Sequence, residues 1–187
     1  RPQHILEVGT LIGYSAILMA AELAPGARIT CVEVSADNAA KARANFAEAG
    51  VADKIEIVVG PGLAVIPKLE GPFDLLFIDA HKAEYLGYLK AAEPKLAKNA
   101  VVVADNVGRF KDDVADFRRG ATGFQRAAGV TVNGTFSPRT GGDGQLDQRL
   151  RFGVQRPGGL RGGAERFVGA HHRRIFPPEL LEAGRDS

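Results

Sequence analysis

Short apolar runs alternate with longer helix-like stretches between residues 4 and 106, and this alternation constrains the fold more than any other feature of the chain. The apolar runs predict strands at His4–Val8, Ile29–Val34, Ile55–Val59, Phe73–Ile78 and Val101–Ala104. Helices are predicted between them at Tyr14–Leu23, Asp37–Ala49, Leu63–Leu69 and Ala83–Leu96. Strands that are short and apolar throughout are typical of parallel sheets covered by helices on both faces. The sequence therefore predicts an α/β fold with a doubly wound, mostly parallel sheet.

The second predicted helix has both of its ends specified locally. Ser35 precedes it as an N-cap, because its hydroxyl can accept a hydrogen bond from a free backbone N–H of the first turn. Gly50 follows it as a stop, because glycine adopts the left-handed conformation that ends many helices. We therefore expect this helix to begin after Ser35 and to end before Gly50.

The composition changes near residue 117, which divides the chain into a predicted core at 1–117 and a Gly/Arg-rich tail at 118–187. The core holds 12 Lys/Arg and 16 Asp/Glu, whereas the tail holds 12 Arg, no Lys and 6 Asp/Glu. The tail is predicted to be an irregular segment, in which Val130–Phe136 and Leu150–Val154 are candidate final strands on either side of the turn-rich residues 137–144, and Pro177–Ala183 is a candidate short helix. The alternative interpretation is that its Gly- and Arg-rich runs are loop or disordered sequence. The arginines are interspersed with Gly and Pro and have no aromatic platform, so we expect at most a weak affinity for polyanions.

The chain also has features that bear on its compartment. No apolar run approaches the roughly 18 residues of a membrane-spanning helix, and the N-terminus lacks the order of a secretory signal. The single cysteine, Cys31, lies in an apolar stretch and is expected to be a buried structural thiol. We therefore predict a cytoplasmic protein with no membrane partner.

A glycine loop follows the first predicted strand, with Gly9 and Gly13 at its two ends. In a doubly wound sheet a nucleotide-like ligand approaches the backbone at this turn, and glycines leave that approach open. Glu33, about twenty residues further on, lies where a carboxylate accepts hydrogen bonds from ribose hydroxyls. The Gly-x-x-x-Gly spacing differs from the fingerprint of dinucleotide-binding proteins, which disfavours an NAD-dependent oxidoreductase and favours a cofactor without phosphates. The alternative interpretation is that both glycines serve only the turn.

Polar residues also follow the fourth and fifth predicted strands: Asp79 after one, and Asp105 and Asn106 after the other. Because neighbouring parallel strands lie about 5 Å apart, these side chains are expected to share one crevice, where two carboxylates need a neutralising partner. Carboxylate and amide oxygens are hard ligands that suit Mg²⁺. The alternative interpretation is that Asp79 caps a helix and that Asp105 and Asn106 form a turn.

The segment from Glu7 to Ser15 reads EVGTLIGYS. It resembles the first motif of the cation-dependent class I S-adenosylmethionine O-methyltransferases, the family that includes catechol and caffeoyl-CoA O-methyltransferases. The similarity extends from about Ile5 to Val107, a little over half of the chain. The resemblance implies a Rossmann-like fold and S-adenosylmethionine as the cofactor.

The resemblance also implies roles for residues of the cofactor site. Gly9 and Leu11 would line the cofactor, Ser15 would contact its methionyl carboxylate, and Glu33 would bind its ribose. The sequence GPGL at residues 60–63 matches the segment that borders the adenine. The residues assigned to cofactor binding in this way are Glu7, Gly9, Leu11, Gly13, Ser15, Glu33, Val34, Gly60, Gly62 and Asp79.

The similarity covers the polar strand ends too, because DAHK at residues 79–82 and ADN at residues 104–106 match the metal-binding motifs of the family. It implies that Asp79, Asp105 and Asn106 are ligands of Mg²⁺ or another divalent cation. Lys82 stands in the place of the catalytic lysine, which implies that it takes a proton from the acceptor hydroxyl. Lys82 and Asp79 are therefore the predicted catalytic residues.

Three neighbours of these residues receive no chemical role at this stage. His81 is a rival base, but we assign it to the solvent-facing surface. Tyr85 and Tyr88 lie three residues apart on the next predicted helix, a spacing that is typical of aromatic residues that contribute to packing.

The predicted function is the Mg²⁺-dependent transfer of a methyl group from S-adenosylmethionine to a hydroxyl of a small catechol-like or vicinal-diol acceptor. One alternative is a non-catalytic or degraded cofactor-binding fragment, because the family's N-terminal helices have no counterpart before Arg1. We expect the chain to be a fragment for the same reason. Another alternative is a tRNA-nucleoside O-methyltransferase, which the basic tail keeps open although nucleic acid is not the favoured partner. Homodimerisation stays open as well.

Overall fold

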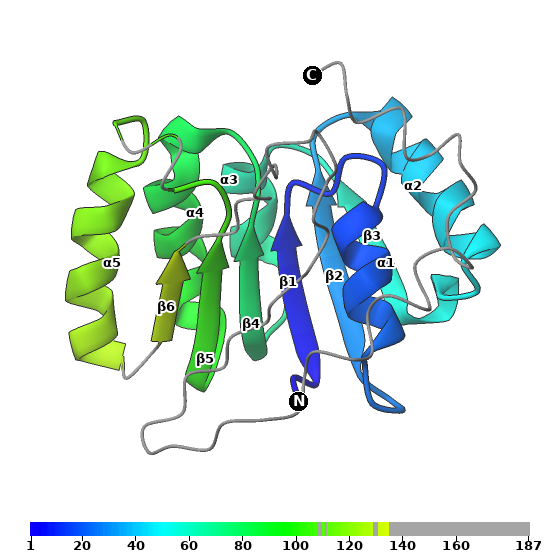
Figure 1. Cartoon of the computed structure of the whole chain (residues 1–187), viewed down its shortest axis with the longest axis horizontal. Coiled ribbons are helices and arrows are strands. Elements are labelled where there is room, and N and C mark those ends of the chain that lie inside the picture. The colour runs from blue at the N-terminus through cyan, green and yellow to red at the C-terminus, as the bar shows by residue number, and fades with distance from the viewer. Residues whose placement is uncertain (108–109, 111, 129–130, 135–187) are drawn as a thin grey trace, which may run out of the picture. The chain divides into compact units, whose positions relative to one another are not determined.

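The computed structural model describes residues 1–107, 110, 112–128 and 131–134, which form a six-stranded parallel sheet flanked by helices (Figure 1). The strands are β1 (His4–Val8), β2 (Arg28–Glu33), β3 (Ile55–Val59), β4 (Phe73–Ile78), β5 (Leu96–Ala104) and β6 (Thr131–Gly134). They lie in the order β3-β2-β1-β4-β5-β6, and all neighbouring pairs in this described sheet are parallel. This arrangement confirms the predicted doubly wound α/β fold.

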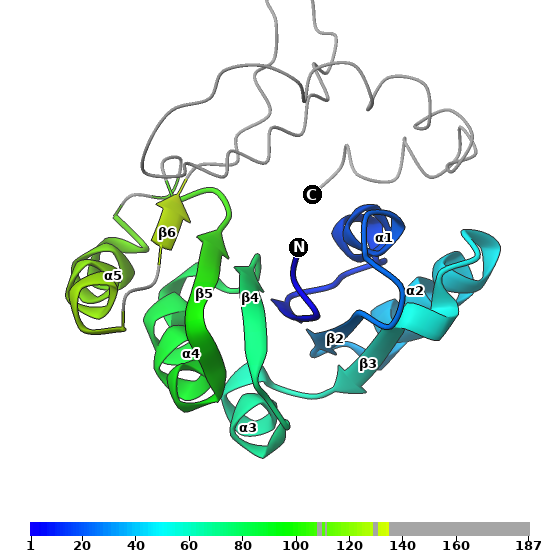
Figure 2. The same cartoon turned by 90° about the horizontal axis from the view of Figure 1, so that it is seen from below.

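Helices cover both faces of this sheet. The α-helices are α1 (Tyr14–Ala21), α2 (Ala36–Glu48), α3 (Gly62–Val65), α4 (Tyr85–Ala92) and α5 (Ala115–Ala128). Short 3₁₀ turns lie at η1 (Ala52–Lys54), η2 (Ile66–Lys68), η3 (Lys82–Glu84) and η4 (Glu93–Lys95). Figure 2 shows α1 on one side of the sheet and α3 and α4 on the other. From β1 the chain adds β2 and β3 in one direction across the sheet, and it then adds β4, β5 and β6 in the other direction. Because crossovers between parallel strands are right-handed, the helices of the two halves lie on opposite faces.

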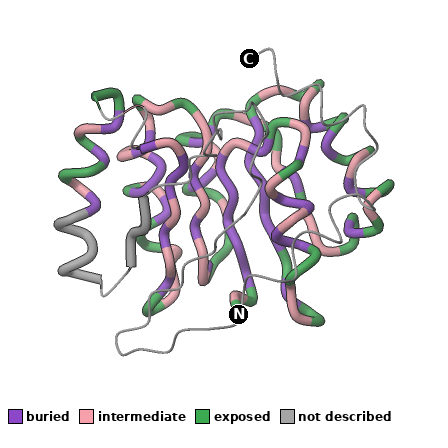
Figure 3. Tube along the Cα trace, viewed as in Figure 1, coloured by how far each residue is buried: buried purple, intermediate pink, exposed green. Residues whose placement is uncertain are grey.

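The central strands β1 and β2 are buried along almost their whole length (Figure 3). Because alternate residues of a strand point to opposite faces of a sheet, both faces are covered here. Leu6 and Val8 of β1 belong to the core cluster that contains residues of β4, β5, α4 and α5. Ile5 of β1 and Cys31 of β2 have the opposite parity and are also buried. The predicted buried thiol at Cys31 is therefore confirmed.

Several element boundaries lie where the sequence predicts them. The bounds of β1, β3 and β4 agree with the prediction, and β2 is displaced by one residue. Ser35 caps α2, since its hydroxyl accepts a hydrogen bond from the backbone N–H of Asn38 at 3.3 Å. Gly50 has a positive φ of 68° directly after the helix, as expected for a glycine stop.

Other boundaries differ because local chemistry interrupts the pattern. The predicted helix at Ala83–Leu96 is α4 with a 3₁₀ turn at each end, and the second turn contains Pro94, which lacks an N–H for an α-helical hydrogen bond. Strand β5 begins at Leu96 instead of Val101. Its first half carries the exposed residues Lys98 and Asn99 and includes a shift of register against β4, so it shows no apolar run.

Helix α5 was not predicted from the sequence, and it runs through residue 117, where the composition changes. Gly120 weakens its helical propensity, yet Val114, Phe117 and Ala121 are buried at helical spacing at its start. Strand β6 lies within the predicted strand at 130–136. The strand predicted at 150–154 and the helix predicted at 177–183 lie outside the described residues.

The turn after β1 requires glycine for two reasons. Gly9 has a φ of 92°, a backbone conformation that residues other than glycine rarely adopt. A Cβ atom at Gly9 would lie 2.0 Å from the main-chain carbonyl oxygen of Asp79, directly after β4. The glycine loop and the end of β4 therefore touch through their backbones.

We predict that Gly9→Ala destabilises the protein by about 3 kcal/mol or more, because the methyl group clashes with main-chain atoms that have little freedom to move. Gly26→Ala is the matched control, since Gly26 has a φ of 82° and open space around it. We expect the control to cost about 1–2 kcal/mol. Urea unfolding of the full chain measures both values, and equal costs would contradict the close approach.

Candidate active site

The carboxyl ends of β1, β2, β4 and β5 are joined by backbone hydrogen bonds that continue the sheet. The N–H of Gly9 donates to the carbonyl oxygen of Val32 at 2.9 Å, and the N–H of Asp79 donates to Val8 at 2.9 Å. The N–H of Asp105 donates to Ile78, also at 2.9 Å. The chain leaves β1 toward one side of the sheet and β4 toward the other, so a crevice is expected between their connections.

The glycine loop is shaped by close contacts at both ends. Gly13 has a φ of 92°, and a Cβ atom there would lie 2.3 Å from the ring of Phe46 in α2. Leu11, between the two glycines, also has a positive φ, at 50°. Packing alone therefore requires glycine at Gly9 and Gly13, and neither end of the loop carries a side chain.

The carboxylate of Glu33 joins the loop to the end of β2. Its Oε2 atom accepts a hydrogen bond from the N–H of Leu11 at 2.7 Å, and its Oε1 atom accepts one from the N–H of Ser35 at 3.0 Å. Glu33 is buried, yet a carboxylate has about four acceptor positions. Glu33 can therefore hold the loop and still accept hydrogen bonds from ligand hydroxyls.

Glu7 lies on the opposite face of β1 from the core cluster around α4 and is completely buried. Its carboxyl group accepts hydrogen bonds from the Ser15 hydroxyl at 2.5 Å and from the Cys31 thiol at 3.1 Å. Burial raises the pKa of Glu7 above its usual range. Glu7 is thus placed behind the loop, where it contacts Ser15 and not the surface.

Exposed apolar side chains gather around this loop. Val34, directly after Glu33, is 69% exposed. The large hydrophobic residues that are exposed in the described part of the chain lie at the end of β3 or in the segments that follow β1, β2 and β3; they are Leu11, Tyr14, Val34, Val59 and Leu63. Gly60 lies among them at the end of β3, and Gly62 is buried at the start of α3. This edge of the sheet therefore offers an apolar surface beside the Glu33 carboxylate.

The polar residues after β4 and β5 come together, as the strand order predicts. Asn106 donates from its backbone N–H to Asp105 Oδ1 at 2.8 Å and from its side-chain Nδ2 to Asp105 Oδ2 at 2.6 Å. Burial, followed by the nearby charge of Asp79, raises the pKa of Asp105 to about 6. The two carboxylates are therefore close enough to repel each other, and a bound cation would relieve that repulsion.

Lys82 is the nearest cation to this acidic pair that the described residues provide. Its Nζ atom lies 2.9 Å from Asp79 Oδ1 and 2.6 Å from the hydroxyl oxygen of Tyr85. Nζ also lies 5.7 Å from the ring centre of Phe110.

His81 is exposed, as predicted. Tyr85 is buried, as its predicted role in packing requires. The sequence did not predict its contact with Lys82, because helical spacing indicates on which face of the helix a ring lies and not which group its hydroxyl reaches.

The donor atoms of this site fit a hard divalent cation. Asp79, Asp105 and Asn106 offer two carboxylates and one amide oxygen, which is the chemistry that Mg²⁺ prefers. Within the residues that the structure describes, no three His, Cys, Asp or Glu side chains are grouped so that they could hold a metal ion by themselves. A cation here would therefore depend on Asn106 as well as on the two aspartates.

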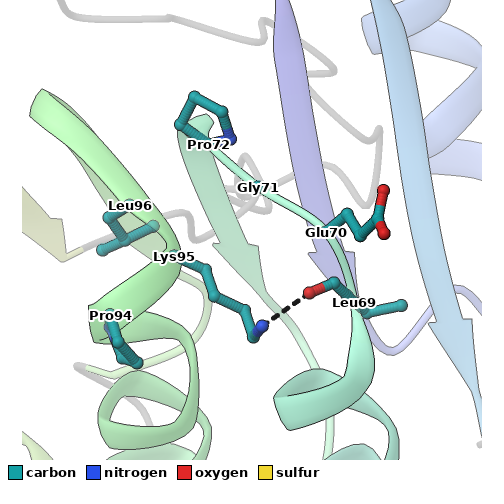
Figure 4. Close-up of a pocket in the computed structure, with 7 residues that line it drawn as sticks. All are labelled: Leu69, Glu70, Gly71, Pro72, Pro94, Lys95 and Leu96. Carbon is teal, nitrogen blue, oxygen red and sulfur yellow. Dashed lines mark hydrogen bonds between the residues drawn. The ribbon is translucent and has the colours of Figure 1, made fainter.

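A separate hollow of about 480 Å³ lies at the opposite edge of the sheet, where β4 and β5 begin (Figure 4). Its lining consists of Leu69, Glu70, Gly71, Pro72, Pro94, Lys95 and Leu96. The ammonium group of Lys95 donates to the carbonyl oxygen of Leu69 at 2.6 Å. This hollow contains none of the predicted site residues.

Among the described helices, none is both long and apolar enough to cross a membrane.

Comparison with known proteins gives a consistent family. A family model described as O-methyltransferase matches residues 2–121. The catechol O-methyltransferase of Mycobacterium tuberculosis is 44% identical over 108 residues, which cover 57% of this chain and 49% of that protein. The catechol O-methyltransferase of Sus scrofa is 39% identical over 114 residues, with coverages of 57% and 61%.

Solved structures agree with these sequence relatives. The O-methyltransferase TomG from Streptomyces achromogenes, in complex with S-adenosylmethionine, has a TM-score of 0.60 and 36% identity, and the match covers 65% of this chain and 60% of TomG. The O-methyltransferase from Bacillus cereus, in complex with S-adenosylhomocysteine, has a TM-score of 0.60 and 32% identity, with coverages of 65% and 61%. The chain spans about half to three fifths of the length of these relatives. Because the family model matches well over half of its residues, the chain belongs to the O-methyltransferase family.

Proposed function

We propose that this chain is an S-adenosylmethionine-dependent, Mg²⁺-dependent O-methyltransferase that acts on a small acceptor with two neighbouring hydroxyls. The observation that carries the proposal is the placement of Glu33 on one side of the β1–β4 switch point and of Asp79, Asp105 and Lys82 on the other. The names of the catechol O-methyltransferase relatives and the ligands of TomG and the Bacillus cereus enzyme support it.

The cofactor side of the crevice has groups that suit an adenosine and an amino-acid end. Glu33 has free acceptor positions for ribose hydroxyls, and the exposed Val34 beside it offers an apolar face for a flat base. Ser15 lies at the start of α1, directly after the glycine loop, and its hydroxyl is oriented by the hydrogen bond that it donates to Glu7. These contacts suit a cofactor that has no phosphate groups.

On the other side, Asp79, Asp105 and Asn106 would hold the divalent cation. When bound, S-adenosylmethionine supplies a methyl group on a positively charged sulfur, and Mg²⁺ supplies charge that makes an acceptor hydroxyl more acidic. As the neutral amine, Lys82 would take the proton of that hydroxyl on the lone pair of Nζ, while Asp79 Oδ1, 2.9 Å away, accepts a hydrogen bond from the same nitrogen. The contribution of the chain is then mainly alignment and control of one proton.

Two competing assignments come from specific observations. Since the chain spans about half to three fifths of its relatives, it can bind the cofactor and still lack part of the acceptor site. The Arg-rich sequence after residue 117 keeps a modified tRNA nucleoside open as an acceptor. Both assignments differ from the proposal in the outcome of a methyl-transfer assay with several acceptors.

Glu33→Gln is expected to weaken the binding of S-adenosylmethionine at least 10-fold, which corresponds to about 1.4 kcal/mol. The amide NH₂ would face a backbone N–H of Leu11 or Ser35, and one acceptor position for the ribose would be lost. Glu56→Gln, an exposed change on the neighbouring strand β3, is the control and should leave the Kd unchanged. Calorimetry on the full chain measures both values, and equal Kd values would remove Glu33 from the site.

Removal of divalent cations is expected to abolish methyl transfer. In an assay with labelled S-adenosylmethionine and a panel of catechols, phenylpropanoids and tRNA nucleosides, Mg²⁺ should support transfer to a catechol and a chelator should stop it. Asp105→Asn should lower the rate on the order of 100-fold or more, whereas Asp53→Asn, an exposed change in η1, should not.

Equal turnover with Mg²⁺ and with chelator would refute the metal-dependent mechanism. Binding of the cofactor without methylation of any acceptor would favour the non-catalytic assignment. Transfer confined to tRNA nucleosides would favour the nucleic-acid assignment.

A further inference from the structure

We propose that Tyr85 is a positioning residue that fixes the amine of Lys82 against the end of β5. This proposal rests on the proposed function for the role of Lys82, but the contacts that carry it belong to the protein alone. Tyr85 is the first residue of α4 and is completely buried. Its hydroxyl oxygen lies 2.6 Å from Lys82 Nζ, the shortest hydrogen bond that Lys82 makes among those described.

The ring of Tyr85 is held by the core. It belongs to the buried cluster of β1, β4, β5, α4 and α5, and it meets the ring of Phe117 edge-to-face, with 5.7 Å between the ring centres and 84° between the planes. Such aromatic contacts favour one orientation of a buried ring. The hydroxyl of Tyr85 is therefore placed by helix packing and not by the 3₁₀ turn η3 that carries Lys82.

The hydrogen of the Tyr85 hydroxyl has an acceptor of its own. The hydroxyl donates to the main-chain carbonyl oxygen of Asp105 at 3.3 Å. A phenolic group has a single hydrogen, so Tyr85 accepts its hydrogen bond from Lys82. The tyrosine thereby links the lysine to the strand end that carries Asp105 and Asn106.

The two partners of Lys82 leave its nitrogen with one open direction. One N–H is used by Tyr85 and another by Asp79 Oδ1, at 2.6 and 2.9 Å. The remaining position of Nζ, which is an N–H in the ammonium form and a lone pair in the amine, is the one that an acceptor hydroxyl can reach. A lysine with a single partner would keep several rotamers and would present this position less often.

The test compares two buried tyrosines of one helix. Tyr85→Phe removes the hydroxyl that contacts Lys82 and keeps the ring. Tyr88→Phe is the matched control, because Tyr88 is also buried and its hydroxyl donates to Glu84 Oε2 at 2.5 Å. Lys82→Met serves as the reference for complete loss of the amine. Each variant of the full chain is measured for kcat, KM, melting temperature and side-chain ¹⁵N resonances of lysine.

We expect Tyr85→Phe to lower kcat about 10- to 100-fold with little change in KM, while Tyr88→Phe stays within about 2-fold of the parent. The Lys82 ammonium resonance, assigned by its loss in Lys82→Met, should be visible in the parent and in Tyr88→Phe and broadened beyond detection in Tyr85→Phe. Equal melting temperatures for the two Phe variants would show that the loss of rate is not a loss of folding.

The proposal is overturned if Tyr85→Phe retains the parent kcat, if both Phe variants lose rate equally, or if the Lys82 resonance is the same in parent and Tyr85→Phe. If the parent transfers no methyl group, the proposed function fails, and the resonance then decides the positioning of Lys82 by itself. The two failures are therefore distinguishable.

Discussion

The contact between Gly9 and the carbonyl oxygen of Asp79 is the constraint on which the site depends. A Cβ atom at Gly9 would lie 2.0 Å from that oxygen, so the backbone of the glycine loop and the backbone after β4 are in van der Waals contact. The sheet brings these ends together, since Asp79 also donates from its N–H to Val8. Because the loop after β1 and the acidic residue after β4 meet there, a ligand on the loop and a cation on Asp79 would be neighbours.

The fold divides the chemistry between the two sides of this contact. Toward β2 and β3, Glu33 accepts hydrogen bonds from the loop and is bordered by exposed apolar side chains such as Val34. Toward β5, burial and the charge of Asp79 raise the pKa of Asp105, and the charge of Lys82 offsets this only in part. An organic cofactor with ribose hydroxyls suits the first side, and a divalent cation suits the second. A methyl donor and a chelated acceptor placed in this way would meet above the Gly9–Asp79 contact.

Much of the fold could be predicted from the sequence, because apolar runs and local caps act over a few residues. Ser35 begins α2 through its side-chain hydroxyl, and Gly50 ends it through its positive φ. The ends of β4 and β5 follow from apolar runs, which places Asp79 near Asp105. Helix α5 could not be predicted in this way, since its stability comes from tertiary packing of Phe117 against the core while Gly120 opposes it. The burial of Glu7 and the hydrogen bond between Tyr85 and Lys82 depend on side-chain directions across elements, which no spacing in the sequence encodes.

The claim that the glycine loop and the cation site share one crevice can be tested most directly with Mn²⁺, a paramagnetic substitute for Mg²⁺. The measurement is an amide ¹H–¹⁵N spectrum of the full chain. Bound at Asp79, Asp105 and Asn106, the ion should broaden the amide signals of these residues and that of Gly9, because the Gly9 backbone touches Asp79. The signal of Lys95, at the opposite edge of the sheet, should stay sharp. Broadening that spares Gly9 or Asn106, or that is centred on Lys95, would contradict a cation site beside the glycine loop.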